Sequence, residues 1–229
     1  MIFLVLAIVI ALLVYLPQLW IRLVMRRHSQ EIPDMPGTGG ELARHLLDRF
    51  ELNDFSVEET APFKDHFDPT SKTVRLSPKN YSGKSLTAIA VAAHEVGHAL
   101  QFHRKEPIFE LRRKYIPLAL SLKQVGILLM MVLPVIAVIF KSPAIIFVFV
   151  GLSIVLQLLG ALSYLILLPE EWDASFNKAL PVLEQGQYIH KNHVDPVSSV
   201  LKAAALTYFA GALADILNIG RWLLILLRR

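Results

Sequence analysis

The chain has 229 residues, of which 54% are hydrophobic, with a mean hydropathy of +0.49 and a net charge of +4. This composition is too apolar for a soluble protein of this size and indicates membrane segments. The absence of cysteine excludes disulfides, iron–sulfur clusters and cysteine-ligated zinc. The basic residues cluster beside apolar runs, which is typical of charges that orient membrane spans, so we expect no nucleic-acid partner.

The first apolar run covers residues 2–21 and carries no charge. Its length is about that needed to cross ~30 Å of hydrocarbon at ~1.5 Å per residue. A secretory signal peptide is the alternative interpretation, but the run lacks a charged leader and a small-residue cleavage site. It ends in Trp20 and Arg22, which are typical of an anchor at the membrane interface. We therefore expect an uncleaved transmembrane anchor over residues 1–25.

A polar segment follows over residues 26–115, and its first motif is "GTGGELARHLLDRF" (37–50). This motif predicts a loop and then a helix, with Thr38 and Glu41 spaced as in a capping box. One face of the helix is apolar, with Leu42, Leu46 and Leu47. His45 on the same helix is interpreted as exposed or partly packed rather than catalytic.

The second motif, "DHFDPTSKTVRLSPKN" (65–80), predicts two short strands around a turn at Asp68 and Pro69. Val74 and Leu76 alternate with polar residues, as in a strand with one buried face. Two roles are open for this β-hairpin. It either offers an edge strand to which an extended peptide adds, or it covers the core of the domain.

The third motif, "TAIAVAAHEVGHALQFHR" (87–104), predicts a helix from about Leu86 to His103, capped by Ser82 or Ser85. An apolar face is expected, with Ile89, Ala93, Val96 and Leu100. Gly97 costs ~1 kcal/mol in a helix interior. That cost is explained if a strand or the substrate approaches the helix closely at this position.

The same helix carries an H-E-x-x-H motif, in which His94 and His98 are one turn apart and project from one side. Two imidazole nitrogens so placed can occupy two corners of a zinc tetrahedron at ~2.0–2.1 Å. Glu95 is expected on the flank, where it can take a proton from the water bound to the metal. Two packed histidines and a surface glutamate are the alternative.

A membrane hairpin is predicted next, with spans at about 116–140 and 143–168 joined by "FKSP". Because the connector is short, the second span returns the chain to the side that it left. The segment 169–205 is then expected to be helical and to lie on the same side as the H-E-x-x-H helix. The last apolar run, 206–227, contains Asp215, Asn218 and Arg221, so the C-terminal segment 206–229 is either a span or an interfacial helix.

Catalytic zinc needs three protein ligands and one open position. The residue types leave several candidates for the third ligand: His103, His190, His193, Glu170, Glu171 and Asp173. The acidic ones come where the third span re-enters the polar side, and they would also suit the start of a new helix there. The basic clusters after the first span and before the second place the segment 26–115 in the cytoplasm, with the N-terminus outside.

The stretches "DHFDPTSKTVRLSP", "AVAAHEVGHALQ", "LPEEWDAS" and "AAALTYFAGAL" resemble, in that order, the bacterial membrane zinc metallopeptidases of the YugP type. The motif order is also similar to the HtpX-type heat-shock proteases and the CAAX prenyl proteases, which are gluzincins whose third ligand is the glutamate of an E-x-x-A-D motif. By this resemblance Glu171 is the ligand, and Glu170 is its rival. The HtpX-type aspartate that supports the first histidine is replaced by Ser175, so Asp173 is expected to take that role.

The resemblance implies a mainly α membrane protein with a small cytosolic α+β zincin-like domain that holds one Zn²⁺ per chain. Its expected activity is zinc-dependent endopeptidase hydrolysis of peptides or proteins, at the cytoplasmic face of a bacterial inner membrane that it crosses several times. His66 and Tyr208 are candidates to stabilise the oxyanion. A catalytically silent metal-bound scaffold for membrane partners is the alternative, and a transporter ranks last because Gln157 is the main polar residue of the middle spans.

Overall fold

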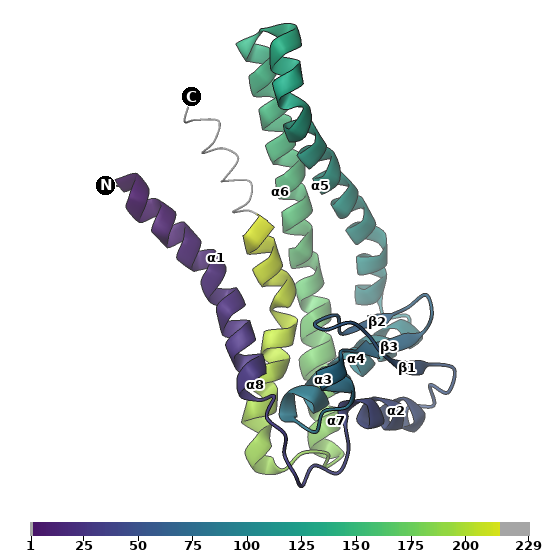
Figure 1. Ribbon diagram of the computed structural model, residues 1–229. Coiled ribbons are helices and arrows are strands. Elements are labelled where there is room, and N and C mark those ends of the chain that lie inside the picture. The colour runs from purple at the N-terminus through teal and green to yellow at the C-terminus, as the bar shows by residue number, and fades with distance from the viewer. Residues whose placement is uncertain (1, 216–229) are drawn as a thin grey trace. The chain divides into compact units, whose positions relative to one another are not determined.

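The computed structural model describes residues 2–215, and these are mostly helical (Figure 1). Three helical stretches among them are long and apolar enough to cross a membrane: Pro107–Phe140, Pro143–Gln185 and Lys191–Asp215. The mainly α architecture with candidate membrane spans and one small sheet confirms the coarse fold expected from the sequence. The first predicted span lies in helix α1 (Ile2–Arg27), which ends in two arginines. Its crossing of a membrane stays a prediction.

The described chain divides into two compact units. One consists of residues 2–17, 110–168 and 208–215, and it holds most of the apolar helices. The other consists of residues 18–109 and 169–207, and it holds the sheet and the H-E-x-x-H helix. The second unit is therefore discontinuous in sequence, because residues 110–168, which belong to the first unit, are inserted between its two parts.

The predicted hairpin forms helices α5 (Pro107–Phe140) and α6 (Pro143–Trp172). Close packing joins them at two glycines: a Cβ on Gly126 would lie 2.8 Å from the Ser153 carbonyl oxygen, and one on Gly160 would lie 2.7 Å from Lys123 Cβ. The Ser153 hydroxyl donates to the Gly126 carbonyl oxygen and accepts from the Gln157 amide. Gln157 thus has a packing role between the helices.

Helix α6 does not end at residue 168, where the sequence predicted that the span stops. It continues to Trp172 and passes without a break into a π-helical segment η1 (Asp173–Ala179) and helix α7 (Leu180–Gln185). The expectation that Glu170, Glu171 and Asp173 open a new helix is therefore wrong. Pro169 lies inside α6 and does not terminate it.

The C-terminal run begins after helix α8 (Val194–Ala205), and its residues 207–215 are helical. Asp215, whose charge argued against a span, pairs with Lys123 of α5 at 2.5 Å between Oδ2 and Nζ. A neutralised pair removes much of the cost of placing either charge in lipid. Asn218 and Arg221 lie outside the described residues, so the choice between a span and an interfacial helix stays open beyond residue 215.

In the discontinuous unit, β1 (Ser56–Glu59), β2 (His66–Asp68) and β3 (Thr73–Leu76) form a sheet in the order β1-β3-β2. The antiparallel β2–β3 pair confirms the predicted hairpin, while β1, which runs parallel to β3, was not predicted. Phe67, Val74 and Leu76 are buried, so the hairpin covers the core. The other role considered for the hairpin, binding of an extended peptide at an edge strand, stays a prediction.

Helix α2 (Gly39–Arg49) has the predicted capping box, in which the Thr38 side chain accepts from Glu41 N and the Glu41 carboxylate accepts from Thr38 N. Helix α3 (Pro78–Tyr81) precedes the long helix α4 (Leu86–His103), which Ser85 caps. Every residue of α4 from Leu86 to Gln101 is buried. The helix is therefore enclosed on all sides, with α2, η1 and α8 packed against it, rather than buried on one face only.

Candidate metal centre

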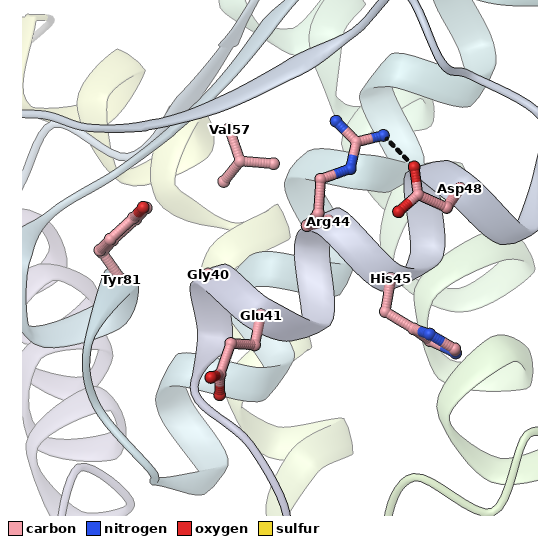
Figure 2. Close-up of a pocket in the computed structure, with 7 residues that line it drawn as sticks. All are labelled: Gly40, Glu41, Arg44, His45, Asp48, Val57 and Tyr81. Carbon is pink, nitrogen blue, oxygen red and sulfur yellow. Dashed lines mark hydrogen bonds and ion pairs between the residues drawn. The ribbon is translucent and has the colours of Figure 1, made fainter.

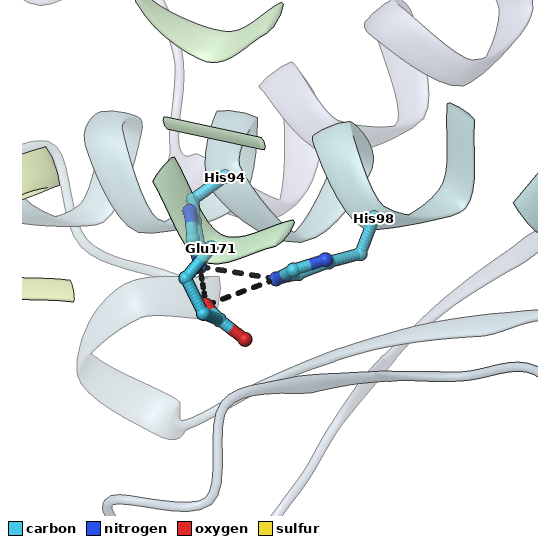
Figure 3. Close-up of side chains that lie close together, drawn as sticks. All are labelled: His94, His98 and Glu171. Atoms are coloured by element: carbon cyan, nitrogen blue, oxygen red, sulfur yellow. Dashed lines mark hydrogen bonds and ion pairs between the residues drawn. The ribbon is translucent and has the colours of Figure 1, made fainter. Parts of the chain in front are cut away.

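Three side chains from distant parts of the sequence meet beside α4 (Figure 3). His94 and His98 extend from α4, and Glu171 extends from the last turn of α6. The two Nε2 atoms are 3.2 Å apart, and Glu171 Oε2 lies 3.1 Å from that of His94 and 3.3 Å from that of His98. Among residues 2–215 this is the one group of three histidine or acidic side chains whose ligand atoms converge in this way.

The dimensions of this triangle match a zinc site. Two ligands at ~2.0–2.1 Å from zinc, at the tetrahedral angle of about 109°, are separated by about 3.3–3.4 Å. The three observed edges of 3.1, 3.2 and 3.3 Å are close to that value. Three protein atoms at three corners leave a fourth corner open, as in catalytic zinc sites.

The hydrogen bond at Nδ1 of His94, the ring nitrogen away from the triangle, determines which of its two nitrogens carries the proton. Ser175 Oγ lies 3.0 Å from His94 Nδ1 and 3.2 Å from the carbonyl oxygen of Leu201. That carbonyl can only accept, so it takes the single hydroxyl proton, and Oγ accepts from Nδ1–H of His94. Nε2 of His94 is therefore left with its lone pair directed at the triangle.

Gln101 does the same for His98. Its Nε2 donates to the Glu170 carbonyl oxygen at 3.0 Å and to Asp173 Oδ2 at 2.8 Å. Because both of these partners accept, the amide is oriented with Oε1 towards His98 Nδ1, at 2.9 Å. Nδ1 of His98 then carries the proton, and Nε2 presents its lone pair.

The electrostatics of the site favour a cation. Burial lowers the pKa of His98, but the carboxylates of Glu171, Glu95 and Glu170 outweigh it and raise this pKa to about 9. The same negative charges that favour an imidazolium favour a metal ion between the ligands. The lone pairs of two imidazole nitrogens and one carboxylate oxygen, which converge beside further buried carboxylates, therefore form a donor set that fits a zinc ion.

Glu95 lies beside this ligand set and is 7% exposed. Burial raises the pKa of its carboxyl group, and the charges of His94, His98 and Glu171 also act on it. Asp65, at the start of the β-hairpin, is near enough to contribute as well. The Asp65 carboxylate is held in place by hydrogen bonds from Ser77 and Asn80. A buried carboxyl group with a raised pKa next to a metal site has the properties of a general base.

Gly97 permits the close approach of the second ligand segment. A Cβ at this position would lie 2.8 Å from the carbonyl oxygen of Ala174. The element that approaches is therefore η1, and not the strand or substrate that the sequence had suggested. Because Ala174 lies between Asp173 and Ser175, contact at Gly97 sets how far Glu171 and Ser175 stand from the histidines.

Gly97→Ala is expected to destabilise the protein by about 1–3 kcal/mol, because the added methyl group overlaps a backbone atom that cannot move alone. It should also weaken zinc binding, since η1 must shift outward. The measurements are thermal unfolding of the purified chain in detergent and zinc titration. Gly151→Ala in α6 is the control, because nothing lies within 4 Å of its Cβ. Equal stability of the two variants would contradict this account of Gly97.

The other candidates from the sequence lie elsewhere. Asp173 does not support His94 as expected; it accepts from Gln101, Lys178 and Asn177, so it acts on the His98 side. Glu170 is fully buried, and its Oε1 lies 3.6 Å from His98 Nδ1, on the side of the ring away from the triangle. The remaining histidines form ring contacts outside the triangle: His103 with Phe55, and His190 with His193.

The two oxyanion candidates are held by other partners. His66 is exposed, and its Nδ1 lies 2.7 Å from the Lys64 carbonyl oxygen. Tyr208 belongs to the other compact unit, where its hydroxyl accepts from Arg112 at 3.1 Å. Their role in catalysis stays a prediction.

Ser175 and Gln101 were missed by sequence reasoning, although their spacing was a signal. Ser175 follows Glu171 by four residues, and Gln101 follows His98 by three, so each lies one turn from a ligand.

Loss of an outer hydrogen-bond partner such as Ser175 typically costs 10–100-fold in metal affinity. We expect Ser175→Ala to weaken zinc binding by about this factor, because His94 loses the group that fixes its tautomer. Competition with a chelating indicator measures the change, with Ser199→Ala on the exposed side of α8 as control. Unchanged affinity would contradict the assigned tautomer.

A hollow of about 460 Å³ lies elsewhere in the same unit, between α2, Val57 of β1 and Tyr81 of α3 (Figure 2). Arg44, His45 and Asp48 line it, and Arg44 pairs with Asp48 at 2.6 Å. His45 is exposed, one of its two expected states, and its Nε2 lies 2.8 Å from the Tyr188 hydroxyl. None of the metal-site side chains lines this hollow, so its size does not make it the reaction site.

Comparisons with known protein families and with individual proteins both find similarity to peptidases. A family model described as "Putative neutral zinc metallopeptidase" matches residues 3–227. The chain is also 38% identical over 191 residues to "Putative membrane protease YugP" of Bacillus subtilis (strain 168), an alignment that covers 83% of this chain and 81% of that protein. No solved structure matches.

Proposed function

Because this chain belongs to the neutral zinc metallopeptidase family, we propose that it is a membrane-embedded zinc-dependent endopeptidase. The observation that carries the proposal is the triangle of His94 Nε2, His98 Nε2 and Glu171 Oε2, with Glu95 beside it. The three ligand atoms would hold one Zn²⁺ per chain. Zinc, when bound, supplies a Lewis acid that polarises a peptide carbonyl and lowers the pKa of bound water towards ~7.

The residues of the chain then have separate tasks. Ser175 and Gln101 hold the two imidazoles in the tautomer that directs Nε2 at the metal. The carboxylate of Glu95 takes a proton from the attacking water and later delivers it to the nitrogen of the departing amine. Burial supports this task, because a raised pKa brings the carboxyl group closer to the operating pH.

The substrate class is peptides or proteins, membrane proteins among them, since the chain is itself a membrane protein. We place it as a multi-pass protein in a bacterial inner membrane. The site then faces the cytoplasm, because Arg22, Arg26 and Arg27 on one side of the polar segment, and Arg112, Arg113 and Lys114 on the other, favour retention inside.

A catalytically silent scaffold is less well supported. A structural zinc site is normally closed by four protein ligands, whereas three converge within residues 2–215. Burying the carboxyl group of Glu95 is costly, and a purely structural site would not need it.

Removal of the metal is expected to abolish proteolysis reversibly. The purified full-length chain in detergent should cleave casein, lose that activity after dialysis against a chelator, and regain it when one equivalent of zinc returns. Release of new amino termini measures cleavage, and elemental analysis measures the zinc content. Cleavage that persists in metal-free protein would overturn the proposed mechanism.

A further inference from the structure

A buried lysine lies next to the metal centre, outside the roles proposed so far. Lys178 is 8% exposed, and it comes from the π-helical segment η1. Its ammonium group donates to Glu106 Oε2 at 2.9 Å and also to Asp173 Oδ2. Glu106 immediately precedes Pro107, the first residue of α5. The lysine thus connects the end of the α4 region to the segment that carries Glu171.

The π-helical turn is what places Lys178 there. In a π-helix the hydrogen bonds run from residue i to i+5, so residues five apart lie one above the other. Asp173 and Lys178 are five apart and meet on one face. In an ordinary α-helix the residue four after Asp173 would occupy that face more closely, and it is Asn177, which donates to the other oxygen, Oδ1.

The contact continues to the metal ligand in two steps. Asp173 Oδ2 accepts from Lys178 and from Gln101 Nε2, and Gln101 Oε1 accepts from His98 Nδ1. An amide group can be reversed end for end with little change in shape. If Gln101 were reversed, its NH₂ group would face His98 Nδ1, and the imidazole proton would move to Nε2, where it blocks the metal.

We propose that Lys178 is a positioning residue for His98, an inference that rests on the proposed metal site. The ammonium group donates to Asp173 Oδ2 and so holds this carboxylate oxygen, which only accepts, in place beside the Gln101 amide. That acceptor, together with the Glu170 carbonyl oxygen, holds the Gln101 amide in the one orientation that leaves Nε2 of His98 available. Lys178 touches neither metal nor substrate; it acts through three successive contacts.

Stability alone is a weak reason for burying the Lys178 ammonium group beside two partly exposed carboxylates. Replacing a whole buried ion pair by apolar residues is often neutral or stabilising, because desolvation offsets the attraction between the charges. The position of the Asp173 acceptor beside the Gln101 amide, by contrast, depends directly on the ammonium group that donates to it.

Lys178→Met in the full-length chain tests the proposal. We expect a 10–100-fold loss of zinc affinity, measured by competition with a chelating indicator. Cobalt(II) in place of zinc should give an altered visible absorption spectrum, which a merely structural role of Lys178 would not produce. Lys202→Met is the matched control, because Lys202 is an exposed lysine on α8, and both properties should stay unchanged there.

A second variant covers the case in which Lys178→Met does not fold. Asp173→Asn leaves Lys178 paired with Glu106, so no charge is stranded, yet its amide can offer a donor to Gln101 and allow the reversed orientation. It should show the same loss of affinity. Wild-type affinity and an unaltered cobalt spectrum in either folded variant would overturn the role of Lys178. If the unchanged chain binds no zinc, the proposed function itself fails, and this inference falls with it.

Discussion

Glu95→Gln is expected to abolish peptide hydrolysis while the protein keeps its zinc. Glutamine has nearly the same shape, but its amide cannot take the proton of the attacking water. General acid–base catalysis typically contributes 10²–10⁴-fold, so activity should fall by at least about that factor. The metal should remain, because Glu95 is not among the three converging ligand atoms. Cleavage of casein and elemental analysis of the same preparation give the two measurements.

The control for this experiment is Glu184→Gln, the same chemical change at an exposed residue of α7. It should retain both activity and zinc. Hydrolysis at the wild-type rate by the Glu95 variant would remove the general base from the mechanism. Loss of zinc together with activity would show instead that Glu95 binds the metal.

Of the two adjacent glutamates, replacement of Glu171 should reduce the zinc content, whereas replacement of Glu170 should leave it unchanged. Glu171→Gln is expected to lose more affinity than the 10–100-fold typical of an outer partner, because Oε2 of Glu171 lies 3.1 and 3.3 Å from the two imidazole Nε2 atoms. Glu170→Gln should keep its zinc, because the Glu170 carboxylate lies on the Nδ1 side of His98, 3.6 Å from that nitrogen.

The two variants control for each other, since both make the same substitution at a buried position of one helix. Zinc per chain by elemental analysis, with a thermal unfolding curve for each variant, separates loss of a ligand from loss of the fold. Retention of zinc by the Glu171 variant and its loss from the Glu170 variant would reverse the assignment. Retention by both would direct the search to His190 and His193.

The sequence was most informative where one helix carries its own signals. A serine cap at residue 82 or 85, the run of small and apolar residues, and the four-residue spacing of the histidines predicted α4 with the bounds it has, and Ser85 is the cap. The capping box of Thr38 and Glu41 predicted where α2 begins. These features depend on local hydrogen bonds and side-chain periodicity, which can be read without knowing the tertiary structure.

Features that depend on contact between distant segments could not be predicted in this way. Strand β1, "SVEE", lacks an alternating apolar pattern, and it is a strand because β3 offers it a partner. The continuity of α6 through Pro169 and the π-helical turn after it have no local signal either. Spacing alone did not assign these roles to Ser175 and Gln101, because Ser175 reaches His94, and the Gln101 amide is oriented, only when η1 packs on α4 at Gly97.

The insertion of residues 110–168 into the sequence of the discontinuous unit has a consequence for biosynthesis. The ribosome produces His94 and His98 first, and Glu171 follows only after the whole of α5 and nearly all of α6 have been made. The proposed zinc site is therefore incomplete while the chain is still short. On the proposed mechanism, the nascent chain therefore has no hydrolytic activity until Glu171 has been synthesised and lies beside the two histidines.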